Sequence, residues 1–411
     1  MRSSNLRIAY QCPQCGAPAT LEETDRLFSC AYCRVKSYLI SGDYFQFVLP
    51  HKAPEEKNLL FFPYWRFKGM LFSCVSTGIR QKFIDASHQA VESKYFPLSL
   101  GFRPQALKLR FLTPETEGNF VHPQQAFDGI TKIFKDRFSG FLPKPVLHQA
   151  HIGESLSLIY APYYRNHNLY DAVLNEPIAA DLLPDFEELI AKAGSPDWGI
   201  RFLPTLCPSC GWDLEGQRDA LVLLCRNCNS AWTAGKDRFI RIEFAHMAGT
   251  GPNIIYLPFW RIKATLSGID LDTYADLIKV ANLPKVPRAD YHDRPFHFWS
   301  LAFKIRPQTF LPLATKMTLS QPQQTLSFEL PKSNLYPVNL PIQEAVETLK
   351  INLANFIKPP KAYLPQLPEI KIKTKDYLLV YVPFCEKHQE LTQPDCNFTI
   401  TKTHLTLAKN L

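Results

Sequence analysis

Eight of the eleven cysteines in this chain fall into two sets of four with the same internal spacing. In each set a Cys-x-x-Cys turn is followed, after fourteen residues, by a second one. The sets are Cys12, Cys15, Cys30 and Cys33, and Cys207, Cys210, Cys225 and Cys228. Thiolates are soft ligands, and four of them in a tetrahedron suit zinc at about 2.3 Å per sulfur. Because each turn supplies two ligands, two facing turns would close one metal site in each set.

Zinc is the first expectation for both sites, and two other chemistries use the same residues. A rubredoxin-like iron centre also has four thiolates in paired turns, so the spacing does not separate iron from zinc. Disulfides or a redox dithiol would need an oxidising compartment, but residues 1–7 lack the apolar core of a signal peptide. Since all four ligands are protein side chains, no coordination position stays open, which favours a structural metal. We therefore expect two structural Zn²⁺ ions.

The first turn of each set has the form Cys-Pro-x-Cys-Gly, and residues 10–48 and 205–244 resemble the zinc-ribbon superfamily. The resemblance implies a small, closed, structural zinc site in each segment. Gly16 and Gly211 follow the second ligand and can take the left-handed conformation. Ribbons often have glycine after the last ligand too, where this chain has Arg34 and Asn229. Arginine tolerates this conformation less well than asparagine, so we expect a different geometry in the second turn of the first ribbon.

A second repeated segment lies downstream of each cysteine set, again 195 residues apart. Residues 61–68 align with residues 256–263, and helix-like stretches follow at 123–138 and 341–357, with a loop expected at about 310–340. We predict a strand-rich α+β fold with two homologous halves, each a four-cysteine zinc ribbon plus an antiparallel sheet with one main helix. The predicted domains are ribbon 1 (1–48), a first α+β repeat (49–195), ribbon 2 (200–244) and a second α+β repeat (245–411).

An aromatic-x-Pro-aromatic element occurs four times, centred on Pro63, Pro162, Pro258 and Pro383. Proline cannot donate a hydrogen bond to a strand ladder, so these positions are expected at sheet edges, bulges or strand starts. An edge strand can pair with an extended segment of another protein. The four elements therefore favour docking of a protein partner.

Alternate residues of the repeated strand form the candidate ligand-facing set: Tyr64, Arg66 and Lys68 in the first copy, and Phe259, Arg261 and Lys263 in the second. An aromatic ring beside two cations could stack a base and contact phosphates. The other interpretation is structural, with each arginine against a carboxylate or an aromatic neighbour. A further lysine-rich stretch, 371–375, is either a solvated sheet face or a surface for phosphates or anionic lipids.

Composition and missing motifs limit the function. Hydrophobic residues make up 46% of the chain, which is enough to form hydrophobic cores. The net charge of +8 is only mildly basic for 411 residues and does not require a nucleic-acid partner. No apolar run approaches the ~18–20 residues of a transmembrane helix, and unpaired thiols such as Cys74 favour a cytoplasmic protein. Phosphate-loop, dinucleotide, His-Glu-x-x-His and Gly-x-Ser-x-Gly motifs are missing. The leading hypothesis is a non-enzymatic scaffold or adaptor that docks protein partners; the alternative is a nucleic-acid-binding protein.

Overall fold

The computed structural model describes residues 5–42, 44–54, 58–125, 127–140, 142–179, 184–195, 199–249, 253–332 and 334–408. The chain forms two compact units. Unit 1 consists of Met1–Lys68, Ile84–Gly140 and Glu154–Pro204. Unit 2 consists of Gly69–Phe83, Phe141–Gly153 and Thr205–Leu411. Two short segments from the first half of the sequence thus belong to the second compact unit.

A large sheet and a small one dominate the first half of the chain. The strands are β1 (Arg7–Gln11), β2 (Pro18–Glu22), β3 (Leu27–Ser29), β4 (Lys36–Ile40), β5 (Phe45–Val48), β6 (Leu59–Val75), β7 (Gly78–Gln89), β8 (Lys108–Phe111), β9 (Asn119–Phe120), β10 (Val146–Asn166), β11 (Asn168–Asp171), β12 (Glu176–Ala179) and β13 (Arg201–Pro204). The large sheet has the order β12-β11-β10-β5-β8-β1-β2, and β6 pairs with β10, β7 and β9. The small sheet is β13-β4-β3, and the helices are α1 (Arg103–Ala106), α2 (Phe127–Ser139) and α3 (Pro184–Ala191).

In the second half, a three-stranded sheet precedes a larger one. The strands are β14 (Val222–Cys225), β15 (Ser230–Ala234), β16 (Phe239–Ile242), β17 (Phe244–Met247), β18 (Ile254–Ser267), β19 (Phe298–Leu301), β20 (Leu326–Ser327), β21 (Asn334–Leu335), β22 (Lys371–Lys387), β23 (Glu390–Gln393) and β24 (Phe398–Thr401). The larger sheet has the order β19-β18-β22-β17-β20, with β21 on β18 and β23 on β22. The helices are α4 (Tyr274–Val280), α5 (Pro307–Ser320), α6 (Ile342–Phe356), α7 (Pro360–Tyr363) and α8 (Lys402–Ala408), with 3₁₀ turns at Ala289–Tyr291 and Leu364–Gln366.

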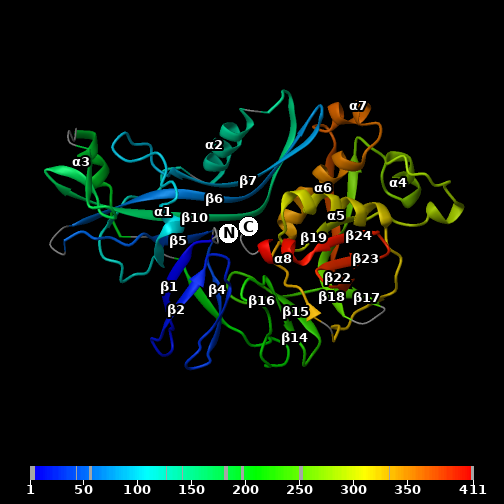
Figure 1. Cartoon of the computed structure of the whole chain (residues 1–411), viewed down its shortest axis with the longest axis horizontal. Helices are drawn as coiled ribbons and strands as arrows, with labels where there is room; N and C mark the ends of the chain where they lie inside the picture. Colours follow the sequence, from blue (N-terminus) through cyan, green and yellow to red (C-terminus); the bar gives the residue numbers. More distant parts are fainter. Residues whose placement is uncertain are drawn as a thin grey trace. The chain divides into compact units, whose positions relative to one another are not determined.

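The strand-rich α+β class is confirmed, but the sheets are mixed rather than antiparallel. Parallel pairs join β1 to β8, β5 to β10, β6 to β9, β17 to β22 and β18 to β21. The expectation of one main helix in the second half is also wrong. Both α5 and α6 are long and pack against β19 (Figure 1).

Helix α5 occupies part of the segment expected as a loop. Pro307 stands in the first turn of α5, where its missing N–H is not needed, and Pro312 lies inside the helix. Phe310, Leu313 and Met317 recur at helical spacing, and all are buried. The apolar face of α5 thus compensates for the internal proline.

The four repeated prolines lie inside long strands, so the prediction of edges, bulges or strand starts is wrong. Three of them stand where one neighbouring strand ends and another begins. On β10, β5 pairs up to Tyr160 and β11 starts at Tyr163, with Pro162 between them. Pro383 lies likewise between β17 and β23, and Pro258 between β21 and β19. A missing N–H is tolerated there because no ladder runs past it on that side.

Each unit has its own hydrophobic core. In unit 2 the core includes Met70, Phe72 and Ile152, which come from the two segments of the first sequence half. The Phe72 and Phe310 rings lie 6.0 Å apart, and the Gly153 N–H donates to the Glu344 carboxylate. These segments are therefore part of the packing that stabilises α5 and α6.

Candidate metal centres

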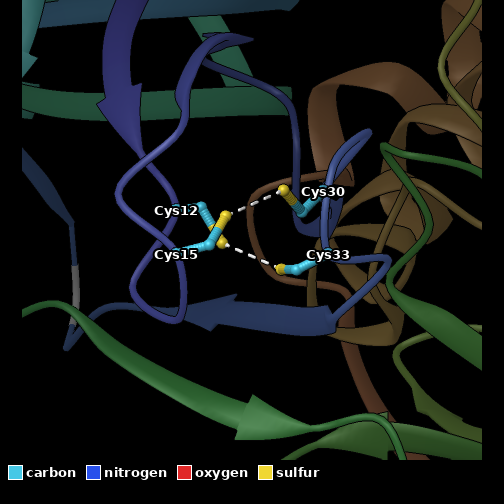
Figure 2. Close-up of side chains that lie close together, drawn as sticks. All are labelled: Cys12, Cys15, Cys30 and Cys33. Carbon is cyan, nitrogen blue, oxygen red and sulfur yellow. Dashed lines mark hydrogen bonds between the residues drawn. The ribbon is translucent and has the colours of Figure 1, made fainter.

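The first cysteine set gathers around one point. The Sγ atoms of Cys12, Cys15, Cys30 and Cys33 all lie within 4.8 Å of one another, and Figure 2 shows the four side chains converging from two turns. Cys12 and Cys33 are 3.6 Å apart and Cys15 and Cys30 are 3.7 Å apart, sulfur to sulfur. A tetrahedron with bonds of about 2.3 Å has edges of about 3.8 Å. The four sulfurs therefore have the spacing of a closed four-thiolate metal site.

The second set has the same geometry. Cys207 and Cys228 lie 3.5 Å apart, as do Cys210 and Cys225, sulfur to sulfur. All eight cysteines are free thiols, far beyond the S–S bond length of about 2.05 Å. Among the described residues, these two clusters are the groups of three or more His, Cys, Asp or Glu side chains placed to hold a metal.

The thiols of the first cluster influence one another's ionisation. A backbone N–H of Cys33, against the effect of burial, lowers the pKa of Cys30 to about 6. A backbone N–H of Val35 favours the Cys33 thiolate, but burial and the thiols of Cys15 and Cys12 outweigh it and raise its pKa to about 12. Several negative sulfurs this close repel one another unless a positive ion lies between them.

Tight turns position the cysteines of the first cluster. The Cys12 N–H donates to the Ala17 carbonyl at 2.9 Å, and the Gly16 N–H to the Cys12 carbonyl at 2.8 Å. The second turn repeats both bonds: Cys30 N–H to the Val35 carbonyl at 3.0 Å, and Arg34 N–H to the Cys30 carbonyl at 3.1 Å. Arg34 has φ 61° and Gly16 has φ 71°. The expected difference in the second turn is therefore wrong: Arg34 adopts the left-handed conformation because the ligand-bearing turn requires it.

In ribbon 2, Gly211 and Asn229 hold the left-handed positions, at φ 73° and 55°. Sequence reasoning missed Ser230, whose Oγ lies 3.0 Å from Cys228 Sγ and 3.9 Å from Cys207 Sγ. The Trp232 indole N–H donates to the same oxygen at 2.8 Å, which leaves the Ser230 O–H directed to sulfur. A hydroxyl donor stabilises thiolate charge. A serine two residues after the last ligand was the available signal.

The first copy of the Trp-Arg-x-Lys strand is fully buried. Arg66 and Lys68 are 1% and 0% exposed. The Arg66 guanidinium donates to both oxygens of Asp85, at 2.8 and 2.9 Å, and to Glu23, while Lys68 Nζ donates to Glu23 at 3.0 Å and to Asn5. Glu23 lies between β2 and β3, so the turn of ribbon 1 is anchored to β6 by buried charges.

These contacts shift the ionisation of the cluster. Burial alone would raise the pKa of Glu23, but the charges and hydrogen bonds of Arg66 and Lys68 lower it to about 2. Burial opposes ionisation of Arg66, yet Glu23 and Asp85 keep its pKa above its ordinary value. The third candidate of this copy, Tyr64, is buried and its hydroxyl lies 3.1 Å from that of Tyr163. In this copy each candidate side chain has partners within the chain.

The second copy has a different environment. Phe259 is buried between the rings of Trp299 and Phe303, whereas Arg261 is half-buried and Lys263 is exposed. Within the described residues, neither cation forms an ion pair. Burial and then the charges of Arg261 and Lys263 lower the pKa of His297 to about 4. Both cations therefore act on His297, in addition to its burial.

Comparison with known proteins does not assign the chain to a family. No family model matches the chain, and no solved structure matches it. The chain is similar to a DNA ligase of Levilactobacillus brevis, with 30% identity over 79 residues. This segment is 19% of the chain and 12% of the ligase, so the chain spans about one eighth of that protein. In the part of the chain that the structure describes, none of the helices has the length and apolar character needed to cross a bilayer.

Proposed function

We propose that both cysteine clusters hold structural Zn²⁺ and that the chain is a non-enzymatic, zinc-stabilised scaffold or adaptor of the cytoplasm. The observation that carries the proposal is that four protein sulfurs surround each site at tetrahedral spacing. No ligand position is left for water or substrate, which is the arrangement of structural sites. The eleven free thiols support a reducing compartment.

Metal analysis tests the first part of this proposal. We expect the purified chain to be colourless and to contain two zinc ions per molecule. Visible absorption from an iron–thiolate centre, or less than one metal per chain, would contradict it. Because small ribbons bury little apolar surface, a chelator should unfold both ribbons.

The tips of the two ribbons are the docking surfaces that we propose for a protein partner. Tyr32 is 72% exposed between the last two ligands of ribbon 1, and Trp212 is 59% exposed after the first two ligands of ribbon 2. Exposed aromatic rings on rigid turns are typical anchors of protein interfaces. Tyr32→Ala and Trp212→Ala should each weaken partner binding at unchanged zinc content. Phe102→Ala, which removes an 85% exposed ring outside the ribbons, is the control.

We also propose that the two halves arose by duplication, with the domain boundaries predicted above. Equivalent hydrogen bonds support this. The Ala90 N–H donates to the Pro63 carbonyl at 2.9 Å, and the Ala302 N–H to the Pro258 carbonyl at 3.0 Å. The indole N–H groups of the two repeated tryptophans also donate to carbonyls: Trp65 to Gln125 at 3.1 Å, and Trp260 to Leu340 at 3.0 Å.

Nucleic-acid binding is the second candidate function. The similarity to a segment of a DNA ligase and the two cations of the second copy, Arg261 and Lys263, favour it. In the first copy Arg66 and Lys68 are enclosed by carboxylates, so the proposal concerns the second copy. Steep weakening of nucleic-acid affinity with added salt would support it, because phosphate contacts release counterions.

A further inference from the structure

Two basic motifs that lie more than a hundred residues apart in the sequence share one face of a strand pair. Strands β18 and β22 are antiparallel neighbours (Figure 1), with Thr265 opposite Lys373 and Ser267 opposite Lys371. Opposite residues of an antiparallel pair point to the same side, as do alternate residues along a strand. The register shifts between Lys263 and Ala264, but β18 keeps its alternation there, because Ile262 and Ala264 are both buried on the other face. Arg261 and Lys263 therefore lie on the same face as Lys371 and Lys373. We call these four residues the basic strip.

The basic strip faces solvent, whereas the other face of the strand pair is packed. Lys263, Lys371 and Lys373 are exposed. The alternate residues Leu266 and Ile372 pack against the core of unit 2. In the described residues, β19 pairs with β18 only as far as Ile262, and β17 pairs with β22 only from Leu379 onward. The segments that carry Lys263, Lys371 and Lys373 therefore pair only with each other. This part of the strip is thus a two-stranded antiparallel pair whose lysine-bearing face is open to solvent.

Asp376 lies on the same face, opposite Lys263, and offsets part of the charge, so the strip of four cations keeps a net positive charge within the described residues. None of its four cations forms an ion pair there. Burial is the main cause of the low pKa of His297, and the charges of Arg261 and Lys263 lower this pKa further. The contrast with the first copy is direct, because the aligned Arg66 and Lys68 are buried against Glu23 and Asp85.

We propose that the basic strip binds the phosphodiester backbone of a nucleic acid without reading its sequence. The inference rests on the second candidate function above and assigns its surface. Thr265 and Ser267 place hydroxyl donors between the cations. Phe259 and Trp299, the rings on this side, are buried, and the exposed Tyr377 is on the opposite side, where it contacts Trp260. We therefore expect contacts to the phosphodiester backbone and not stacking on bases. The described strip also has no exposed apolar side chain that could enter a membrane.

Salt dependence gives a quantitative test. Each phosphate neutralised in a duplex contributes about −0.9 to the slope of log affinity against log salt, and about −0.7 in a single strand. Four cations on one face predict a slope of about −3.6 for duplex DNA. Removal of three of them should reduce that slope by about 2.7.

The experiment uses the full-length, zinc-loaded chain and a labelled duplex DNA of mixed sequence, followed by fluorescence anisotropy over a salt series. The test variant carries Lys263→Gln, Lys371→Gln and Lys373→Gln. The control variant carries Lys279→Gln, Lys332→Gln and Lys361→Gln, three exposed lysines of unit 2 outside the strip, so both variants lose the same charge. We expect the test variant to lose more than about tenfold in affinity at low salt together with most of the slope, and the control to keep both.

Three results would overturn the assignment: equal losses in both variants, no loss in the test variant, or binding to phosphatidylserine vesicles without binding to DNA. Metal content is measured on the same samples. Two zinc ions per chain without DNA binding would reject the strip and leave the structural-zinc proposal intact. A parent chain that contains no zinc would reject the structural-zinc proposal, whatever the result for DNA binding.

Discussion

At the scale of single residues, the two cysteines of each Cys-x-x-Cys turn differ in burial. Cys12 and Cys207 are each 2% exposed, whereas Cys15 and Cys210 face solvent. In the proposed zinc sites, a buried cysteine would both bind the metal and fill the small core around its cluster. Its loss therefore removes coordination and packing together.

Cys12→Ser and Cys207→Ser should each release one zinc and unfold the affected ribbon, while the other ribbon keeps its metal. Zinc stoichiometry and hydrogen exchange of the ribbon amides measure both effects. Cys396→Ser is the matched control, because Cys396 is also buried and lies outside both clusters. Retention of two zinc ions by either ligand variant would reject the two-site assignment.

Glu23 is a buried, ion-paired carboxylate of unit 1 and should contribute to its acid sensitivity. Its folded pKa of about 2 lies below the ordinary 4.5, so the stabilisation is complete above about pH 4.5 and is lost as the pH falls toward 2. The difference corresponds to about 3 kcal/mol. Glu23→Gln should therefore lower the free energy of unfolding by about 3–5 kcal/mol at neutral pH and flatten the acid limb of the stability profile.

Chemical denaturation across pH measures this change. The control is Glu187→Gln, which breaks an exposed pair with Arg165 and should cost less than about 1 kcal/mol. Equal losses of unfolding free energy in the two variants would mean that the ion pairs of Glu23 with Arg66 and Lys68 do not stabilise the fold more than an exposed pair does.

At the scale of elements, the four Cys-x-x-Cys turns share one conformation that the residue types alone do not reveal. Glycine predicted it correctly at positions 16 and 211, but Arg34 adopts it as well, against its own preference. The left-handed conformation costs a residue with a Cβ about 1–2 kcal/mol. Two backbone hydrogen bonds compensate for this cost, and the proposed metal coordination would add to them.

Arg34→Gly should therefore tighten ribbon 1, and Gly16→Ala should weaken it, each by about 1 kcal/mol. No atom lies within 4 Å of a Cβ built on Gly16, so the penalty there is conformational and not steric. Competition with a chelator measures zinc affinity in both variants. Gly42→Ala, at a glycine without positive φ and with equally open space, should leave the affinity unchanged.

Local sequence patterns predicted some helices and both cysteine clusters. They failed where the environment of a residue depends on segments that are distant in the sequence. The helix expected at 341–357 is α6 (Ile342–Phe356), and the one expected at 123–138 is α2 (Phe127–Ser139). The spacing of the cysteines predicted both clusters. The interior location of Pro162 and Pro258 was not predictable, because it depends on which strands flank them. The burial of Arg66 depends likewise on Glu23, 43 residues away in the sequence.

At the scale of the whole molecule, sequence order and compact units do not coincide. Strands β6 and β10 each run on into residues that belong to unit 2, at Gly69 and before Glu154. The core of unit 2 therefore needs residues from the first sequence half, including Phe72 and Ile152. A fragment of residues 205–411 would lack these side chains and expose the surfaces of α5 that they cover.

Phe72→Ala should consequently destabilise unit 2 although the residue belongs to the first half of the sequence. Phe72 is 1% exposed and lies 6.0 Å from Phe310 of α5, ring to ring, so its truncation should cost about 3–5 kcal/mol. Hydrogen exchange is the appropriate measurement, because the loss should appear first in the amides of α5, α6 and β19. Phe102→Ala, at an exposed ring of unit 1, should leave those amides protected. Faster exchange confined to unit 1 would show that the β6–β7 segment does not support the core of unit 2.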